Sequence, residues 1–213
     1  MKIVLATKKK GKAAEFASIL GDKFELITQA EAGITESAEE NGTTYAENSR
    51  LKAKFIFEKT GLPTMADDSG LECDALDGAP GVYTARFAGE GATDSTNIDK
   101  LLAVLDEEEN RKARFVAHIT LVMENYEIHC EGTLDGEITR GRRGTNGFGY
   151  DPVFIPEGYD KTLAELDDEV KNSISHRRKA IEKMQKKREE IFVLSSKNYN
   201  FAFRFSRNLK SRF

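Results

Sequence analysis

The feature that most limits the possible folds is an alternating segment in the middle of the chain. Between residues 113 and 123, apolar side chains at odd positions alternate with a mixed set at even positions. The odd set is Phe115, Ala117, Ile119 and Leu121, and the even set is Val116, His118, Thr120 and Val122. A period of two is that of a β-strand. A second strand over 127–134, after a turn at Glu124–Asn125, predicts a β-hairpin.

The other periodic segments alternate between strand and helix. We predict, in chain order, a strand over 2–6, a helix over 8–20, a helix from about 44 to 60, a short strand over 63–67, a strand at the PVFI segment and a charged helix from 173 to about 194. No repeat or linker divides these segments. The sequence therefore predicts an α/β fold with residues 1–194 in one domain.

Composition narrows the class of protein. The chain has 213 residues, a net charge of −4 and two cysteines, Cys73 and Cys130, that lie far apart and outside any metal-ligand spacing. An acidic net charge argues against a general nucleic-acid binder, and no apolar run is long enough to cross a membrane. We expect a cytoplasmic protein with both cysteines in the core or at the surface, and His118 and His129 in structural rather than catalytic positions.

The first polar constellation is the segment ATKKKGK, residues 6–12. It joins the predicted first strand to a helix, so the N-terminal amides of that helix can face an anion. Thr7 and Lys12 flank the loop, which indicates phosphate binding. The segment lacks the GxxxxGK[ST] pattern of a Walker A loop, and a lysine run that opens a helix is also typical of solvated surface.

The second constellation is MADDSGLECDALDGAPG, which begins at Met65. We interpret Asp67 and Asp68 as the end of a strand entering a turn. Strand alternation points the two side chains to opposite sides, so only one of them faces a given cleft. Mg²⁺ prefers oxygen ligands, often one or two carboxylates plus substrate phosphates, and the acidic stretch from Glu36 to Glu47 can supply a second carboxylate. The competing interpretation is a polar turn in which the aspartates cap backbone amides.

The third constellation combines RGRRGTNGFGYDPVF, residues 140–154, with the start of the last predicted helix. Glycines around Phe148 let the backbone approach a flat ligand, and an aromatic ring there can stack on a base. The helix start holds the donor-rich run Ser175, His176, Arg177 and Arg178. The alternatives are a core phenylalanine and a solvated basic helix face. A phosphate cradle, carboxylates and an aromatic platform together favour nucleotide chemistry.

These segments resemble a known family, the inosine triphosphate pyrophosphatases. The similar blocks are ATKKKGKAAEF, TYAENSRLKAKF, ADDSGLECDALDGAPGVYTARFAG, RGTNGFGYDPVF and AEL with KNSISHRRKA, in the family's order, from about residue 2 to 191. The resemblance implies a long twisted mixed sheet with flanking helices, two lobes around a central cleft and a homodimer. It also implies Mg²⁺-dependent hydrolysis of dITP, ITP and XTP to the monophosphate and pyrophosphate. This reaction removes non-standard purine nucleotides from the nucleotide pool.

The resemblance also implies roles for single residues, carried over by matching positions. Asp68 matches the catalytic base and a metal ligand, and Glu40 matches another metal ligand. The positions that match substrate contacts are Thr7, Lys8, Lys9, Lys10, Gly11, Lys12, Ser69, Phe148, Gly149, Tyr150, Asp151, Lys171, His176 and Arg177. The triphosphate is expected along residues 7–12, with Lys12 its most direct partner, and the base along the later residues.

Two positions depart from the family's pattern, and one segment lies outside it. Lys9 stands where the family usually has Asn, and Asn146 where Gly is common, so both can alter loop geometry. Residues 195–213 form a basic, aromatic tail without a counterpart in the resemblance. Basic aromatic tails can bind nucleic acid, although a loosely docked terminus is the simpler interpretation.

Two competing functions remain open at this point. The first is a pyrophosphatase for pyrimidine or other damaged nucleotides, as in the septum-associated house-cleaning proteins; pyrophosphate release from dTTP or dUTP rather than ITP would favour it. The second is a nucleotide- or RNA-binding module with structural carboxylates. Salt-sensitive RNA binding without Mg²⁺-dependent turnover would favour that module.

Overall fold

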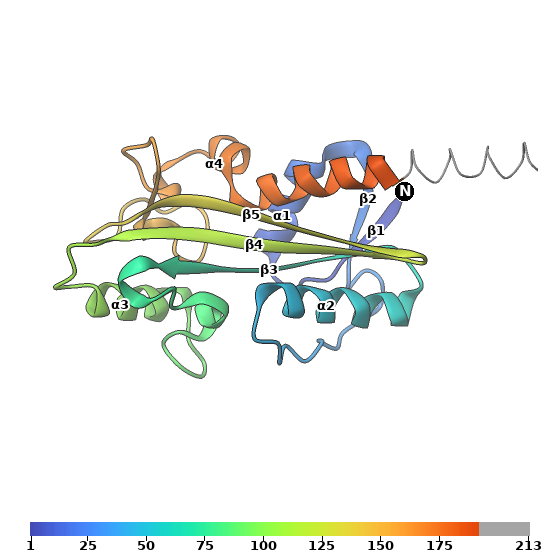
Figure 1. Cartoon of the computed structure of the whole chain (residues 1–213), viewed down its shortest axis with the longest axis horizontal. Helices are drawn as coiled ribbons and strands as arrows, with labels where there is room; N and C mark the ends of the chain where they lie inside the picture. Colours follow the sequence, from blue (N-terminus) through green and yellow to red (C-terminus); the bar gives the residue numbers. More distant parts are fainter. Residues whose placement is uncertain (192–213) are drawn as a thin grey trace, which may run out of the picture.

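A six-stranded mixed sheet organises the fold in this computed structural model, which describes residues 1–191 (Figure 1). The strands are β1 (Lys2–Leu5), β2 (Glu25–Thr28), β3 (Thr64–Cys73), β4 (Lys112–Met123), β5 (Tyr126–Ile138) and β6 (Phe154–Pro156), in the spatial order β2-β1-β3-β4-β5-β6. β1 pairs in parallel with both β2 and β3, and the remaining pairs are antiparallel. The mixed sheet expected from the resemblance is confirmed.

The predicted hairpin runs along the long axis of the molecule (Figure 1). β4 and β5 pair antiparallel from Lys112↔Glu137 to Met123↔Tyr126, with the turn at residues 124 and 125, as predicted. The alternation of β4 is also confirmed, because Ile119 and Leu121 pack in one core cluster and Val122 in another on the opposite face. Both strands extend beyond the bounds predicted from the sequence. They connect the two ends of the elongated molecule (Figure 1).

Helices cover both faces of the sheet. They are α1 (Lys10–Leu20), α2 (Tyr45–Thr60), α3 (Asp94–Val104), α4 (Asp168–Ile174) and a last helix over residues 176–191. Figure 1 shows α1, α4 and the last helix on one face and α2 and α3 on the other. Phe16 of α1 and Ile181 of the last helix pack in one apolar cluster, whereas Ala53 and Ile56 of α2 pack in a separate one.

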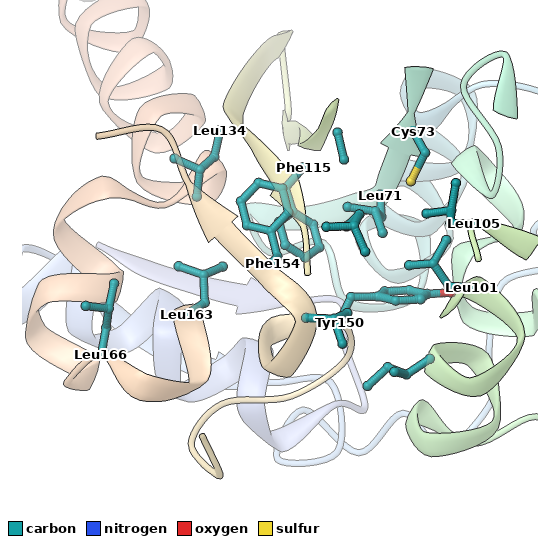
Figure 2. Packing of buried hydrophobic residues seen from close by; sticks show 14 residues of the cluster. Leu71, Cys73, Leu101, Leu105, Phe115, Leu134, Tyr150, Phe154, Leu163 and Leu166 are labelled. Atoms are coloured by element: carbon teal, nitrogen blue, oxygen red, sulfur yellow. The ribbon is translucent and has the colours of Figure 1, made fainter. Parts of the chain in front are cut away.

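A third apolar cluster fills the far end of the long strands, where α3 lies (Figure 1), and Figure 2 shows its packing. The rings of Phe115 and Phe154 lie 4.7 Å apart at its centre, and Tyr150 enters it with its hydroxyl donating to the Thr84 carbonyl. Cys73 belongs to this cluster and Cys130 to the cluster under the last helix, so both are buried free thiols, as expected. Separate cores at the two ends agree with an arrangement in two lobes.

Two predicted boundaries are wrong. The short strand expected to end at Asp67 continues as β3 to Cys73, since its pairing with β4 holds Asp67, Asp68, Ser69 and Gly70 in extended backbone. Gly70 marks a close approach rather than a turn, because a Cβ there would lie 2.3 Å from the Gly81 carbonyl oxygen. The helix predicted from Ser173 is instead two helices, interrupted where Ser175 is extended (φ −62°, ψ 151°).

The predicted charged helix and the tail reach beyond the described residues. Within residues 1–191, no helix is both long and apolar enough to span a membrane. The basic tail, residues 195–213, lies outside the described residues.

A capping box fixes the start of α2. The Thr44 hydroxyl accepts from the Glu47 amide, and the Glu47 carboxylate accepts from the Thr44 amide at 3.1 Å. Thr44→Ala is expected to lower the free energy of unfolding by about 1 kcal/mol, measured by urea denaturation. Thr44→Ser keeps the hydroxyl and is expected to match wild type. Equal losses in both variants would show that the cap is not what Thr44 contributes.

Candidate active site

A cleft of about 600 Å³ opens between the loop after β1, the inner face of α2, the middle of β3 and the segments 148–151 and 171–177. Of the residues that the sequence assigned to a site, all but Lys10 line this cleft. Lys10 is exposed at the first position of α1. Three constellations that are distant in sequence therefore share one cleft.

The loop after β1 presents the N-terminus of α1 to the cleft. No described side chain caps α1, although the Thr7 hydroxyl accepts from the Lys9 amide at 3.1 Å. The first amides of a helix need an acceptor, and the helix dipole favours a negative one. Gly11 lies against Phe148, and a Cβ at Gly11 would come within 2.8 Å of that ring. The loop that can bind an anion therefore lies next to the Phe148 ring.

Asp67 lies at the centre of a buried group of charges. Lys12 approaches its carboxylate at 2.5 Å and Arg177 at 3.3 Å, and Arg177 also pairs with Glu15 at 2.8 Å and donates to the Ser69 hydroxyl at 2.8 Å. Burial would raise the pKa of Asp67, but Lys12 and Arg177 hold it well below its ordinary value. Burial lowers the pKa of Lys12 to about 8, against the effect of Asp67. Asp67 is therefore a permanently charged anchor.

Asp68 faces the opposite side of β3 from Asp67, as the alternation predicted. Both residues nevertheless line the cleft, so the expectation that only one of them would face it is wrong. Its carboxylate accepts from the Lys52 ammonium at 2.7 Å, and Glu40 accepts from the same ammonium at 2.9 Å. Burial raises the pKa of Asp68, while Lys52 acts in the opposite direction. The interpretation of the aspartates as caps of backbone amides is wrong, since both bind basic side chains.

The donor set around Lys52 suits a divalent cation. Two carboxylates already converge on one positive charge, which stands in for a metal ion and shows that both can reach it. Within residues 1–191, no three His, Cys, Asp or Glu side chains are arranged to hold a metal. Mg²⁺ commonly uses one or two carboxylates and completes its shell with waters and phosphate oxygens. Glu40 and Asp68 fit that pattern.

Phe148 forms an aromatic wall with cations against its ring. The Lys171 ammonium lies 4.6 Å and the Arg177 guanidinium 5.4 Å from the ring centroid. Asp151 holds this wall, because its carboxylate pairs with Lys171 at 2.5 Å and accepts from the Phe148 amide at 2.8 Å. The Gly149 amide donates to Asp94. The loop is therefore fixed by buried charge rather than by apolar packing alone.

His176 lies in the cleft wall with its ring stacked on Phe115, at 5.0 Å between centroids and 11° between planes. Neither ring nitrogen has a hydrogen-bond partner among the described residues, and the residue is only 5% exposed. Burial lowers the pKa of His176 well below its ordinary value, and Arg177 adds to the effect. The ring is thus neutral, with one donor and one acceptor available to a ligand.

Sequence reasoning missed Lys52 and Glu15. Lys52 follows Asn48 and Ser49 by one helical turn on the buried face of α2, and a charge at such a position needs a partner. Glu15 lies between apolar residues on the buried face of α1, which gives the same signal. His118 lies in β4 and bonds Ser49, and His129 bonds Thr120, so the structural interpretation of these two histidines agrees with their contacts.

Comparisons with known proteins agree with this architecture. The model of the Ham1 family matches residues 3–187. A dITP/XTP pyrophosphatase of Escherichia coli O157:H7 is 47% identical over 188 residues, which span 84% of this chain and 94% of the relative. One of Flavobacterium johnsoniae is 44% identical over 184 residues, 86% and 96% of the two chains. The solved structure of a Ham1 protein from Staphylococcus aureus is similar at a TM-score of 0.80 and 41% identity, over 89% and 99% of the two chains.

Proposed function

Because the chain belongs to the Ham1 family, we propose that it hydrolyses non-standard purine nucleoside triphosphates, dITP, ITP and XTP, to the monophosphate and pyrophosphate. One observation carries this proposal beyond family membership. An uncapped helix N-terminus, a pair of carboxylates and an aromatic wall with donor groups open into one cleft. These are the needs of a triphosphate, a metal-assisted hydrolysis and a purine base.

The triphosphate lies along Thr7–Lys12 in this proposal. The amides at the start of α1 bind phosphate oxygens, and Lys12 adds a positive charge near the β3 strand. Lys8 and Lys9 are exposed at the mouth of the same loop and attract the anion. Lys9, which replaces the family's usual Asn, also supplies its backbone as the N-cap of α1, a role that depends little on the side chain.

Asp68 orients the attacking water in the proposed reaction. The water oxygen forms a bond to the α-phosphorus, its proton passes to a carboxylate, and the bond to the bridging oxygen breaks as pyrophosphate leaves. Glu40 and Asp68 would hold a divalent cation, proposed to be Mg²⁺, which neutralises phosphate charge and acidifies water when bound.

The base lies against Phe148 in this proposal, with His176 and Lys171 at its edge. The neutral His176 ring has a free donor for a 6-oxo group, which hypoxanthine and xanthine carry and adenine lacks. Arg177 already donates hydrogen bonds to Asp67, Glu15 and Ser69. We therefore assign it chiefly to fixing the position of the residues around the base. Homodimer assembly and a cytoplasmic location stay predictions, as does a separate role for the tail.

The reaction can be tested by identifying its products in isotopically labelled water. With ITP, Mg²⁺ and H₂¹⁸O, we expect IMP and pyrophosphate, with the heavy oxygen in IMP. Label in orthophosphate, with IDP as the second product, would contradict attack at the α-phosphorus. Turnover of dTTP or dUTP in preference to ITP would favour the pyrimidine alternative.

Glu40→Gln tests the second carboxylate. The neutral amide keeps the size of the side chain but removes a charge from the proposed metal site, so a higher Mg²⁺ concentration is needed for half-maximal rate, by about tenfold. The measurement is initial rate against Mg²⁺ at saturating ITP. Glu39→Gln, one residue earlier and outside the cleft lining, is the matched control. Superimposable titrations of Glu40→Gln and wild type would remove Glu40 from the site.

A further inference from the structure

Lys52 occupies the space that a metal ion would need. Its ammonium lies 2.9 Å from a Glu40 oxygen and 2.7 Å from an Asp68 oxygen, and its side chain is only 15% exposed. Lys52 extends from the inner face of α2, while Glu40 precedes that helix and Asp68 belongs to β3. Three separate parts of the chain thus meet at one ammonium group.

The ammonium neutralises a site that is otherwise unfavourable. The Asp68 side chain is only 13% exposed, and its carboxylate and that of the more exposed Glu40, at 43%, repel each other unless a cation lies between them. A divalent cation that coordinates the same Glu40 and Asp68 oxygens would have to lie where the ammonium lies. Two cations that close to the same two oxygens would repel each other strongly. Lys52 and a metal ion are therefore competitors for Glu40 and Asp68.

We propose that Lys52 is the internal cation of the nucleotide-free protein, and that a divalent metal binds Glu40 and Asp68 only when the Lys52 ammonium leaves them. This inference rests on the proposed function, because it takes the two carboxylates as metal ligands. It adds an exchange of Lys52 for the metal ion. Metal binding is weak until the Lys52 ammonium pairs with another anion.

The proposed triphosphate is that anion. Lys52 lines the same cleft as residues 7–9 and Lys12, so its released ammonium faces the phosphates without leaving the site. Lys12 is already paired with Asp67 on the other side of β3 and does not compete for Glu40. Metal and nucleotide therefore bind with positive coupling, in which each ligand raises the affinity for the other by the same factor. The consequence is a carboxylate pair protected from metal ions until substrate arrives.

Mg²⁺ binding to the nucleotide-free protein tests the exchange directly. By calorimetric titration, Lys52→Met is expected to bind Mg²⁺ about tenfold more tightly than wild type, since the competing charge is gone. Lys54→Met is the matched control, because Lys54 lies on the same helix but pairs with Glu127 away from the cleft. Adding Glu40→Gln to Lys52→Met is expected to abolish the gain. Mg²⁺ binding by Lys52→Met that is no tighter than wild type would overturn the proposal.

Coupling gives a second measurement. The ratio of Mg²⁺ affinities with and without α,β-methylene inosine triphosphate is expected to be smaller in Lys52→Met than in wild type, and an unchanged ratio would contradict the exchange. If Lys52→Met does not fold, NMR of the Lys52 side chain in wild type replaces it: the signal should move when Mg²⁺ and the analogue are added together. A signal that stays unchanged overturns the proposal. Failure of the proposed function would appear separately, as absence of pyrophosphate release.

Discussion

Asp68→Asn is expected to lower kcat for ITP by at least about a hundredfold. The amide has nearly the size of the carboxylate but cannot accept a proton from water or offer a full charge to a metal, and general-base contributions are typically about 10²–10⁴-fold. Lys52 keeps Glu40 as a partner, so the fold should persist. The measurement is the steady-state rate of pyrophosphate release at saturating ITP and Mg²⁺, together with the thermal unfolding midpoint.

The control for Asp68→Asn is Asp22→Asn, an equivalent change at an exposed position outside the cleft. It should leave kcat within about twofold of wild type, as most surface substitutions do. If folded Asp68→Asn kept more than about a tenth of the wild-type kcat, a loss of less than about 1.4 kcal/mol, Asp68 would not be the group that orients the water.

Arg177→Met is expected to cause the largest loss of stability, about 3–5 kcal/mol, because it leaves the buried Glu15 carboxylate without a cation. Glu15 loses its partner at 2.8 Å, and one of its oxygens already has no hydrogen bond among the described residues. Asp67 retains Lys12. The free energy of unfolding in urea, with and without a non-hydrolysable nucleotide, measures the loss.

The neighbouring arginine is the control for Arg177→Met. Arg178 pairs with Glu182 at 3.5 Å at the surface and donates to the Asn172 carbonyl, so Arg178→Met is expected to cost about 1 kcal/mol. Similar losses for the two variants would show that the buried pairs of Arg177 contribute little. A large loss also means that activity changes in Arg177 variants cannot be assigned to base recognition alone.

The sequence predicted best the elements whose pattern is local. The alternation in β4 depends on which face is buried, and the turn at residues 124–125 is coded by those residues, so the hairpin was found. β3 was cut short because Ser69 and Gly70 are poor strand formers on their own. They are extended since β4 pairs with them along the whole strand, and Gly70 is required by the Gly81 carbonyl that packs on it.

The sequence predicted the candidate site as separate blocks of residues. It could not predict the contacts between those blocks. Alternation gave the opposite directions of Asp67 and Asp68, but not their partners. Arg177 reaches Asp67 across 110 positions of the sequence, and the Asp68 partner Lys52 comes from a helix on the other face. Such pairs are set by how helices pack on the sheet, which no local pattern encodes. Lys52 was therefore missed although its buried helical position carried a signal.

The measurement that tests the account most directly is kcat/KM for dITP, ITP, XTP, GTP, ATP and dTTP, with detection of pyrophosphate. The free donor of His176, which we propose binds a 6-oxo group, is left unpaired when adenine binds, so ITP and XTP should be hydrolysed at least about a hundredfold more efficiently than ATP. GTP also has a 6-oxo group, and its discrimination must arise at the 2-amino group. Equal kcat/KM values for ITP and ATP would contradict the proposed selection of non-standard purines.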